Sequence, residues 1–277
     1  FWKDVWRRFR VNPLAMIGLG IISIVLLLVI FGPTMTGKNY EFINYEVRNL
    51  SPSSEYWFGT DEMGRDIFTR VCVGGRISII IGFTCTLVSF IIGTFLGGLA
   101  GFLGGKVDDI IMRVVEIIDS IPYLVLVVIL SFLLGRSIPS LVFAMTIMSW
   151  TGTTRIVRGQ ILQIKNQDFV AAARALGANT GRIIIKHLLP NTLGVIMVNI
   201  TMSVPGFIFS ESFLSYIGLG VRPPGTSWGA LASLYQSQLM FYPHQLFFPS
   251  ALIILTVLSF HLVGDGLTDA LDPKLRR

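Results

Sequence analysis

Residues 168–190, DFVAAARALGANTGRIIIKHLLP, form a polar-punctuated segment between two strongly apolar stretches of the chain. The alanine run near its start favours a helix. Four apolar residues recur there at helical spacing, namely Phe169, Ala172, Ala173 and Leu176. A short amphipathic helix is therefore predicted to begin near Asp168.

Two turn signals divide this segment. Gly177 is predicted to end the first helix, because glycine readily adopts the left-handed conformation found at helix C-termini. Asn179 and Thr180 can then cap a second short helix, which Pro190 is predicted to end. The segment thus predicts a compact knob of two short helices. An amphipathic connector lying on the membrane surface is the alternative interpretation.

The composition is that of a membrane protein. Apolar residues make up 52% of the 277 residues, charged residues only 14%, and the mean hydropathy is +0.69. Soluble domains have about 25% charged residues. The formal net charge of +6 does not indicate nucleic-acid binding, because the basic residues alternate with apolar spans instead of gathering on one strip.

The apolar runs predict an all-α integral membrane protein with six transmembrane helices. A basic, aromatic segment at residues 1–13 is predicted to be amphipathic and cytoplasmic. The first span is predicted at residues 14–33, an extracytoplasmic loop at 34–76, five further helices within 77–266 and a cytoplasmic tail at 267–277. With this topology fifteen Lys and Arg lie inside and seven outside, in agreement with the positive-inside rule.

The predicted second span, from residue 77 to 105, carries glycines at four-residue spacing. They are Gly93, Gly97, Gly101 and Gly105. This spacing predicts a face on which another helix packs closely. The third span is predicted to be kinked by Pro122.

No stretch fits a phosphate-binding loop. The closest string ends in Gly104-Gly105-Lys106, but Ala100 stands at the first glycine position and Val107 where Ser or Thr should hold magnesium. We therefore expect ATP and Mg²⁺, if they are used, to bind to another subunit. No catalytic, metal or cofactor site is predicted in this chain.

The predicted outer loop contains GTDEMGRD at residues 59–66, where glycines flank charged residues. Chemistry alone favours a structural turn in which Asp61 caps a short helix and Arg65 or Arg70 pairs with a carboxylate.

Glu211 lies in the predicted fifth span, after Pro205 and before Ser212. A carboxylate within hydrocarbon costs about 2 to 3 kcal/mol, so it should face protein or a wet cavity. Two roles remain open, a structural hydrogen-bonded residue and a residue of the translocation path or its gate.

Four separated stretches resemble one family. Residues 168–190, with Leu189 and Pro190 at their end, resemble the cytoplasmic EAA loop of ABC importer permeases, although Ala171 stands where that family usually has Glu. Residues 59–66 resemble the G-T-D-x-x-G-R-D signature of the oligopeptide and dipeptide permeases. The strings ESFLSYIGLG at 211–220 and ALDPKLRR at 270–277 are similar to the same family.

The resemblance implies a type I ABC importer permease fold with a cytoplasmic coupling helix, in a bacterial cytoplasmic membrane with both termini inside. It implies a heterodimer with a second homologous permease subunit, two cytoplasmic ATPase subunits and an extracytoplasmic peptide-binding protein. The cargo would be di- or oligopeptides moved by alternating access. Nickel chelates, glutathione or another small solute are the alternative cargo.

The resemblance also implies roles for particular residues. The ATPase-coupling loop would span residues 164–190 and comprise Asp168, Phe169, Ala171, Ala172, Arg174, Leu176, Gly177, Leu189 and Pro190. The family signature in the outer loop would comprise Gly59, Thr60, Asp61, Gly64, Arg65 and Asp66. A secondary transporter driven by an ion gradient is the rival class, and it leaves the predicted knob unexplained.

Overall fold

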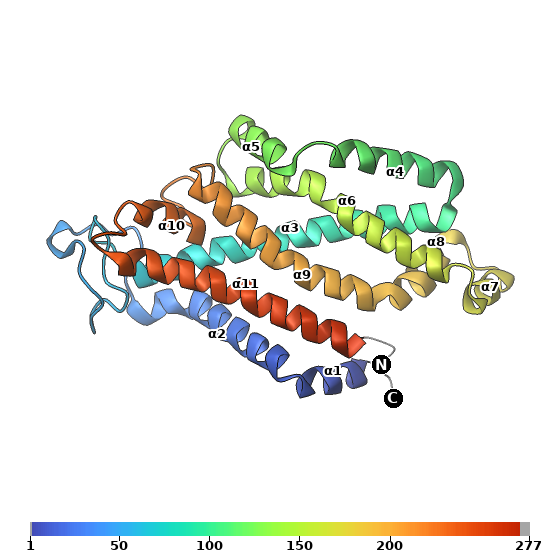
Figure 1. Cartoon of the computed structure of the whole chain (residues 1–277), viewed down its shortest axis with the longest axis horizontal. Coiled ribbons are helices and arrows are strands. Elements are labelled where there is room, and N and C mark those ends of the chain that lie inside the picture. The colour runs from blue at the N-terminus through green and yellow to red at the C-terminus, as the bar shows by residue number, and fades with distance from the viewer. Residues whose placement is uncertain (1, 272–277) are drawn as a thin grey trace.

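Long helices run side by side along one axis of the molecule (Figure 1). The computed structural model describes residues 2–271. In chain order the elements are α1 (Trp2–Val11), α2 (Pro13–Thr36), the 3-10 turn η1 (Tyr45–Val47), α3 (Ile67–Leu103), α4 (Gly105–Asp119), α5 (Tyr123–Leu134), α6 (Ile138–Ile164), α7 (Asp168–Ala175), α8 (Thr180–Arg182), the π-helical η2 (Ile183–Leu188), α9 (Leu189–Tyr216), α10 (Trp228–Gln236) and α11 (Pro243–Leu271). The predicted all-α architecture is confirmed for this part of the chain.

Within residues 2–271, four helical stretches are long and apolar enough to cross a membrane. They are α2, α3, the continuous stretch Thr180–Tyr216 and α11. The pair α4 and α5 makes a fifth if it counts as one span, bent by 79° at the predicted Pro122 kink. The remaining predicted span corresponds to α6, which has 27 residues but carries Arg155 and Arg158 in its second half. The structure thus supports four or five apolar spans, and the sixth stays a prediction.

The predicted loop at residues 34–76 is too long at both ends. Helix α2 continues to Thr36, and α3 begins at Ile67 because Asp66 caps it by accepting a hydrogen bond from Thr69 N at 2.8 Å. The predicted loop extended to Arg76 because this residue is charged. Arg76 instead lies within α3, and its Nε donates to the carbonyl of Val29 in α2 at 2.9 Å. The loop between α2 and α3, called the outer loop after its predicted side, therefore comprises residues 37–66.

The predicted tail also differs. Helix α11 continues through residues 267–271, and residues 272–277 lie outside the described part of the chain. At the other terminus, α1 confirms the predicted amphipathic segment. Val5 and Phe9 are buried, whereas Trp2 and Trp6 are about half exposed.

Three of the four predicted ladder glycines form the contact between α3 and α6. A Cβ at Gly93 would lie 2.5 Å from Thr153 Cβ, and one at Gly97 would lie 2.6 Å from Thr154 O. A Cβ at Gly101 would lie 2.9 Å from Ile161 Cβ. Gly105 does not belong to this face, because the chain turns there to begin α4.

We expect Gly97→Val to destabilise the protein by about 1 to 3 kcal/mol, because the added methyl groups would force α3 and α6 apart. Thermal unfolding in detergent measures the effect. Gly152→Val is the matched control, since a Cβ there has no neighbour within 4 Å. An equal unfolding temperature for the two variants would contradict the close helix contact.

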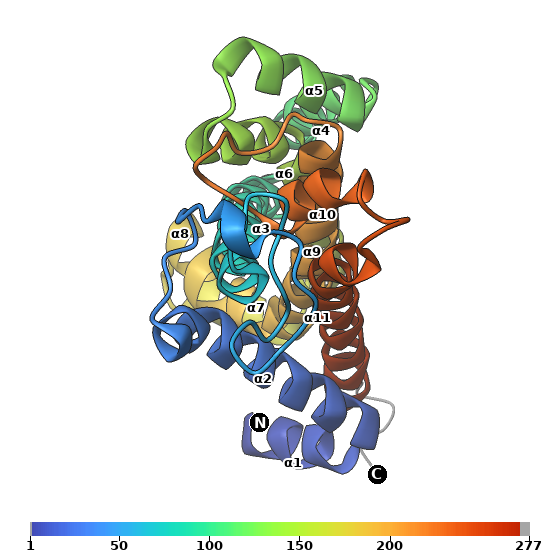
Figure 2. The ribbon, with the colours of Figure 1, turned by 90° about the vertical axis from the view of Figure 1, so that its left-hand side faces the viewer.

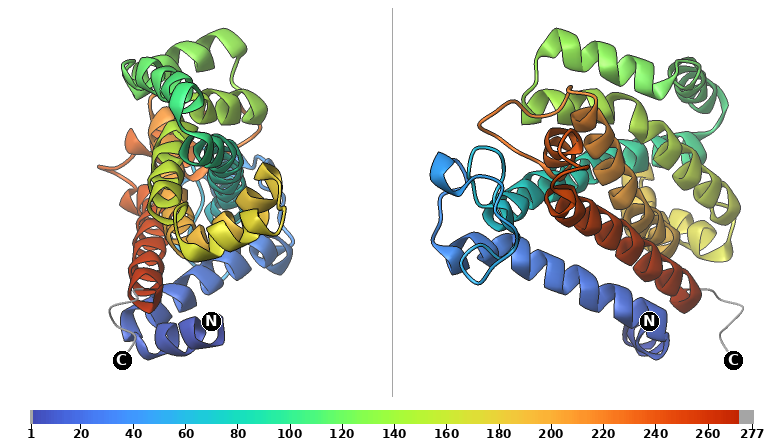
Figure 3. Two further views of the ribbon diagram at one scale, coloured as in Figure 1. Left: turned by 90° about the vertical axis from the view of Figure 1, so that its right-hand side faces the viewer. Right: turned by 60° about the vertical axis from the view of Figure 1, so that its left-hand side comes forward.

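The two ends of the bundle differ. Figure 2 looks at the end formed by residues 37–66 and α10, where irregular chain covers the helices. Figure 3 shows the opposite end, with α7, α1 and the C-terminal end of α11. The knob and both ends of the described chain thus lie on one side.

Candidate functional site

Helix α7 ends in a tight turn built on Gly177. This glycine has φ +80°, and its N–H donates to Arg174 O at 3.0 Å, while Ala178 N donates to Ala173 O at 3.0 Å. This pair of bonds is the Schellman motif, which needs a left-handed residue at the position of Gly177. The predicted helix end is therefore confirmed, and the turn fixes the shape of the knob.

The knob packs on its own subunit through only part of its apolar surface. Val170 is 1% exposed and Ala173 is 6% exposed, and both face inward. Phe169 is half-buried, so the predicted apolar stripe is divided between two faces. Ala171 and Ala172 are exposed, and Leu176 is 89% exposed at the tip. An apolar patch of Ala171, Ala172 and Leu176, called the knob patch below, is left open to solvent.

The predicted second short helix is not separate. Asn179 caps α8 by accepting from Arg182 N at 2.8 Å, as predicted. Pro190 does not end it, because the chain passes through the π-helical η2 directly into α9. A proline has no N–H for the carbonyl four residues earlier, and the wider π spacing, with Leu189 N donating to Ile184 O, carries the helix past it. The second half of the knob is thus continuous with α9.

Basic residues tie the knob region to the end of α3. The guanidinium of Arg174 lies 5.7 Å from the ring centre of Phe102, a cation–π contact. Lys165 Nζ donates to Gly101 O at 3.0 Å. A displacement of α7 would therefore be transmitted to α3 as well as to α9.

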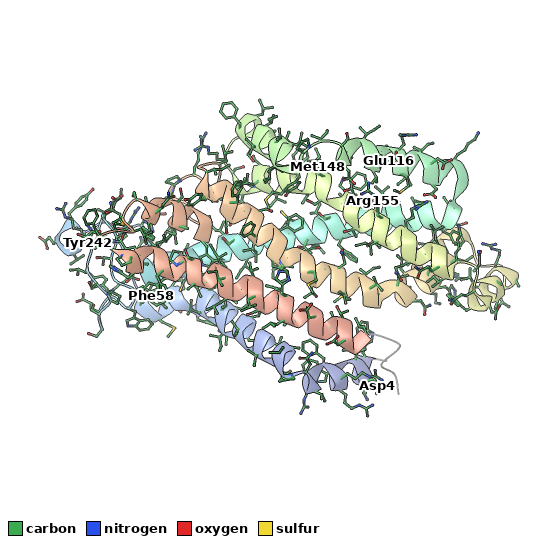
Figure 4. All side chains as sticks on the ribbon, viewed as in Figure 1. Asp4, Phe58, Glu116, Met148, Arg155 and Tyr242 are labelled. Carbon is green, nitrogen blue, oxygen red and sulfur yellow. The ribbon has the colours of Figure 1, made fainter. Side chains whose placement is uncertain are left out.

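Two ion pairs fasten α4 to α6. Arg158 binds Asp108 through two bonds of 2.5 and 2.6 Å, and Arg155 lies 2.6 Å from Asp119. Figure 4 shows Arg155 on α6 beneath the helix that carries Glu116. Within α4 itself, Arg113 pairs with Glu116 at 3.0 Å. Charges at both ends of α4 thus hold it to α6.

The outer-loop signature forms a closed knot around Asp61. This buried carboxylate accepts from Arg65 Nε at 2.8 Å, Arg70 Nη1 at 3.0 Å and the backbone N–H groups of Met63 and Arg65. The pairing predicted for Arg65 or Arg70 is confirmed, and both arginines bind Asp61. The predicted capping by Asp61 is wrong, because Asp66 caps α3 instead.

The other signature residues close the same knot. Thr60 is buried, and its hydroxyl accepts from Leu50 N at 2.8 Å and donates to Val47 O. Gly59 and Gly64 have positive φ, and a Cβ on Gly64 would collide with the Asn44 carbonyl. The signature is therefore a structural device that holds the outer loop against the start of α3.

Glu211 is fully buried in a cluster of hydroxyl groups. Its carboxylate accepts from Ser78 Oγ at 2.8 Å and from Ser215 Oγ at 2.6 Å. Ser78 Oγ also accepts from the backbone N–H of Trp228 in α10, at 3.2 Å. Glu211 thus joins α3, α9 and α10 at the end of the bundle where α10 lies, a geometry that favours the structural role.

A polar cavity of about 280 Å³ lies between α3, α5, α6 and α9. No charged residue lines it among those described. Its polar lining consists of Thr86, Ser89, Tyr123, Ser149, Thr153, Asn199, Ser203 and Ser210. The predicted path candidates Glu211, Pro205 and Ser212 are not in the lining, although Gly206 and Ser210 next to them are.

Sequence reasoning missed this cavity. Its hydroxyls come from four helices, and many also bond within their own helix, as Ser203 Oγ does to Asn199 O at 2.7 Å. Ser89 Oγ is buried without a hydrogen-bond partner in the described chain. The helical spacing of Asn199, Ser203, Gly206 and Ser210 on α9 is the signal that could have indicated it.

Long apolar helices with an uncharged polar cavity between them suit a polytopic membrane permease, and comparisons with known proteins agree. A family model described as "Binding-protein-dependent transport system inner membrane component" matches residues 93–277. A second, described as the N-terminal TM domain of oligopeptide transport permease C, matches residues 1–52. The chain therefore belongs to the family of binding-protein-dependent transport system inner membrane components.

Similar proteins span nearly the same length. Oligopeptide transport system permease protein OppC of Bacillus subtilis (strain 168) is 48% identical over 100% of this chain and 90% of its own. Dipeptide transport system permease protein DppC of that organism is 46% identical over 100% of this chain and 87% of its own. Glutathione transport system permease protein GsiD of Pectobacterium atrosepticum is 38% identical over 99% of this chain and 92% of its own.

Solved structures show the same fold. A chain from the inward-facing MetNI methionine ABC transporter aligns with a TM-score of 0.59 and 21% identity, covering 73% of this chain and 96% of that one. The bundle described above is therefore the fold of an ABC transporter membrane subunit.

Proposed function

We propose that this chain is the permease subunit of an importer that moves di- or oligopeptides into a bacterial cell. Relatives named as oligopeptide and dipeptide permeases, at 48% and 46% identity over the whole chain, support the cargo class. ATP and Mg²⁺ would bind to two separate ATPase subunits, and an external binding protein would deliver the peptide.

The observation that carries the proposal is the knob patch. Leu176, at 89% exposure, is a large apolar side chain on a short helix whose other face is buried. An apolar tip on a rigid base is suited to a groove in a partner protein. We assign that partner as an ATPase subunit, and we assign to the same contact surface the neighbouring Asp168 and Arg174.

The polar cavity supports a peptide cargo. A peptide main chain offers neutral donors and acceptors, and the hydroxyls of the lining match them without selecting a side-chain charge. Ser89 Oγ, which has no partner within residues 2–271, is free to bond to the main chain. A relative that is 38% identical is named as a glutathione transport permease. Glutathione is therefore the second candidate cargo, because it is itself a short peptide.

The topology proposed is six spans with both termini in the cytoplasm. Helix α6 would be the remaining span, the fourth in chain order, with Arg155 and Arg158 near its inner end bound to α4. The position of α1 and the end of α11 on the same side as α7 supports this orientation (Figure 1). A second, homologous permease subunit would complete the path.

Transport would proceed by alternating access. Closure of the ATPase pair on ATP would move the knob, and the continuous helix from α8 to α9 would carry that movement to the cavity. The contacts of Arg174 and Lys165 would carry it to α3.

Co-purification of the tagged chain from native membranes tests the proposal. We expect a second permease and ATPase subunits in the purified complex, with ATP hydrolysis stimulated by a peptide-loaded binding protein. A lone chain or a homo-oligomer without ATPase activity would contradict it.

A further inference from the structure

A second, smaller cavity lies at the end of the molecule opposite α7 and contains three arginines. Its volume is about 260 Å³, and it is enclosed by the start of α3, α10 and the turns that follow α5 and α9. Its charged and hydroxyl-bearing lining residues are Arg70, Arg136, Arg222, Ser215, Thr226 and Ser233. Within the described chain no aspartate or glutamate lines it.

Arg70 is a fixed cation at the base of this cavity. It is 7% exposed, and its Nη1 binds Asp61 Oδ2 at 3.0 Å. Asp61 also binds Arg65, so one carboxylate faces two guanidinium groups. The Nε of Arg70 is buried and has no hydrogen-bond partner within residues 2–271. A buried cationic donor without an acceptor is costly, and a bound anion would supply the acceptor.

The other two arginines come from separate turns. Arg222 N donates to Arg136 O at 3.4 Å, which holds the two turns together. Both residues are exposed, and neither belongs to an ion pair within the described chain. Their side chains are therefore available to a ligand that enters from the outer side.

We propose that this cavity receives the free α-carboxylate of the peptide cargo, an inference that rests on the proposed function. Guanidinium groups bind carboxylates through paired, charge-assisted hydrogen bonds. Pockets for whole ligands have volumes of roughly 300–1,000 Å³, so 260 Å³ suits one end of the cargo.

An acidic side chain of the external binding protein is the competing occupant, because it has the same chemistry. A docking contact and a cargo contact respond differently to the concentration of the binding protein. A docking contact is overcome by a higher concentration of binding protein, whereas a cargo contact persists at saturation and depends on the peptide terminus.

The test compares two peptides of one sequence, one with a free C-terminal carboxylate and one with a C-terminal amide. The complete importer is reconstituted in liposomes, and uptake of each radiolabelled peptide is measured at saturating, fully loaded binding protein. The variants are Arg136→Gln and Arg222→Gln, whose side chains are exposed and lie outside the Asp61 knot, with Arg222→Lys as the charge-retaining control. Wild-type uptake of both peptides is measured alongside.

We expect each Gln variant to lower uptake of the carboxylate peptide about tenfold, as for loss of one charge-assisted hydrogen bond, and to leave uptake of the amide unchanged. Arg222→Lys should retain part of the preference. Equal losses for both peptides, or a loss that disappears at high binding-protein concentration, would overturn the inference. Failure of the wild-type complex to import either peptide would instead overturn the proposed function.

Discussion

Leu176→Glu is expected to stop ATP-driven uptake while the chain still accumulates in the membrane. Leu176 is 89% exposed, so the charge disrupts no packing inside this chain. In a complex the same charge would be buried in an apolar groove. We expect this burial to weaken the binding free energy by about 2 to 4 kcal/mol, which lowers the affinity roughly 30- to 1,000-fold. Peptide uptake and the amount of ATPase retained on the purified variant measure the effect.

Leu176→Met is the matched control, because it keeps the volume and the apolar surface, and it should transport normally. Gly177→Pro should behave like the Glu variant. Proline fixes φ at about −65°, whereas Gly177 has φ +80°, and proline lacks the N–H that donates to Arg174 O. A charge at Ala172 should have the same effect. Normal uptake by these variants would show that the knob patch does not couple ATP hydrolysis to transport.

Asp61→Ala is expected to cost about 3 to 5 kcal/mol of stability, enough to prevent accumulation of the folded chain. The substitution leaves the guanidinium groups of Arg65 and Arg70 without their shared carboxylate, and Arg70 is buried. It also removes the acceptor for two backbone N–H groups of the outer loop. The amount of folded protein in membranes and its unfolding temperature in detergent measure the loss.

Glu62→Ala is the control for this prediction. Glu62 is the next residue in the chain and carries the same charge, but within residues 2–271 its carboxylate accepts only one long hydrogen bond, from Gln238 at 3.5 Å. This variant should accumulate and unfold like the wild type. If Asp61→Ala matched it, the knot would not be the structural device described above.

Much of the fold follows from local patterns in the sequence. Apolar length predicts the long helices, and the four-residue glycine spacing predicts a close helix contact, which Gly93, Gly97 and Gly101 make with α6. The left-handed turn at Gly177 follows from the conformational freedom of glycine. These features depend on neighbours within one or two helical turns.

Features that depend on distant residues could not be predicted. Asp119 stands at helical spacing from Glu116, yet it pairs with Arg155 across to α6. Trp228 follows the turn-rich string Pro223-Pro224-Gly225, yet it is fully buried in α10, where its Nε1 donates to Val71 O at 2.9 Å. Local spacing alone does not determine which helix lies opposite.

The central claim is that ATP hydrolysed by partner subunits drives peptide import through this chain. Uptake of a labelled peptide into liposomes containing the complete purified complex tests it most directly, with ATP enclosed and the loaded binding protein outside. Uptake should require ATP and the binding protein, and should persist when an ionophore removes ion gradients. Uptake that proceeds without ATP and collapses with the ionophore would contradict the account and indicate a gradient-driven transporter.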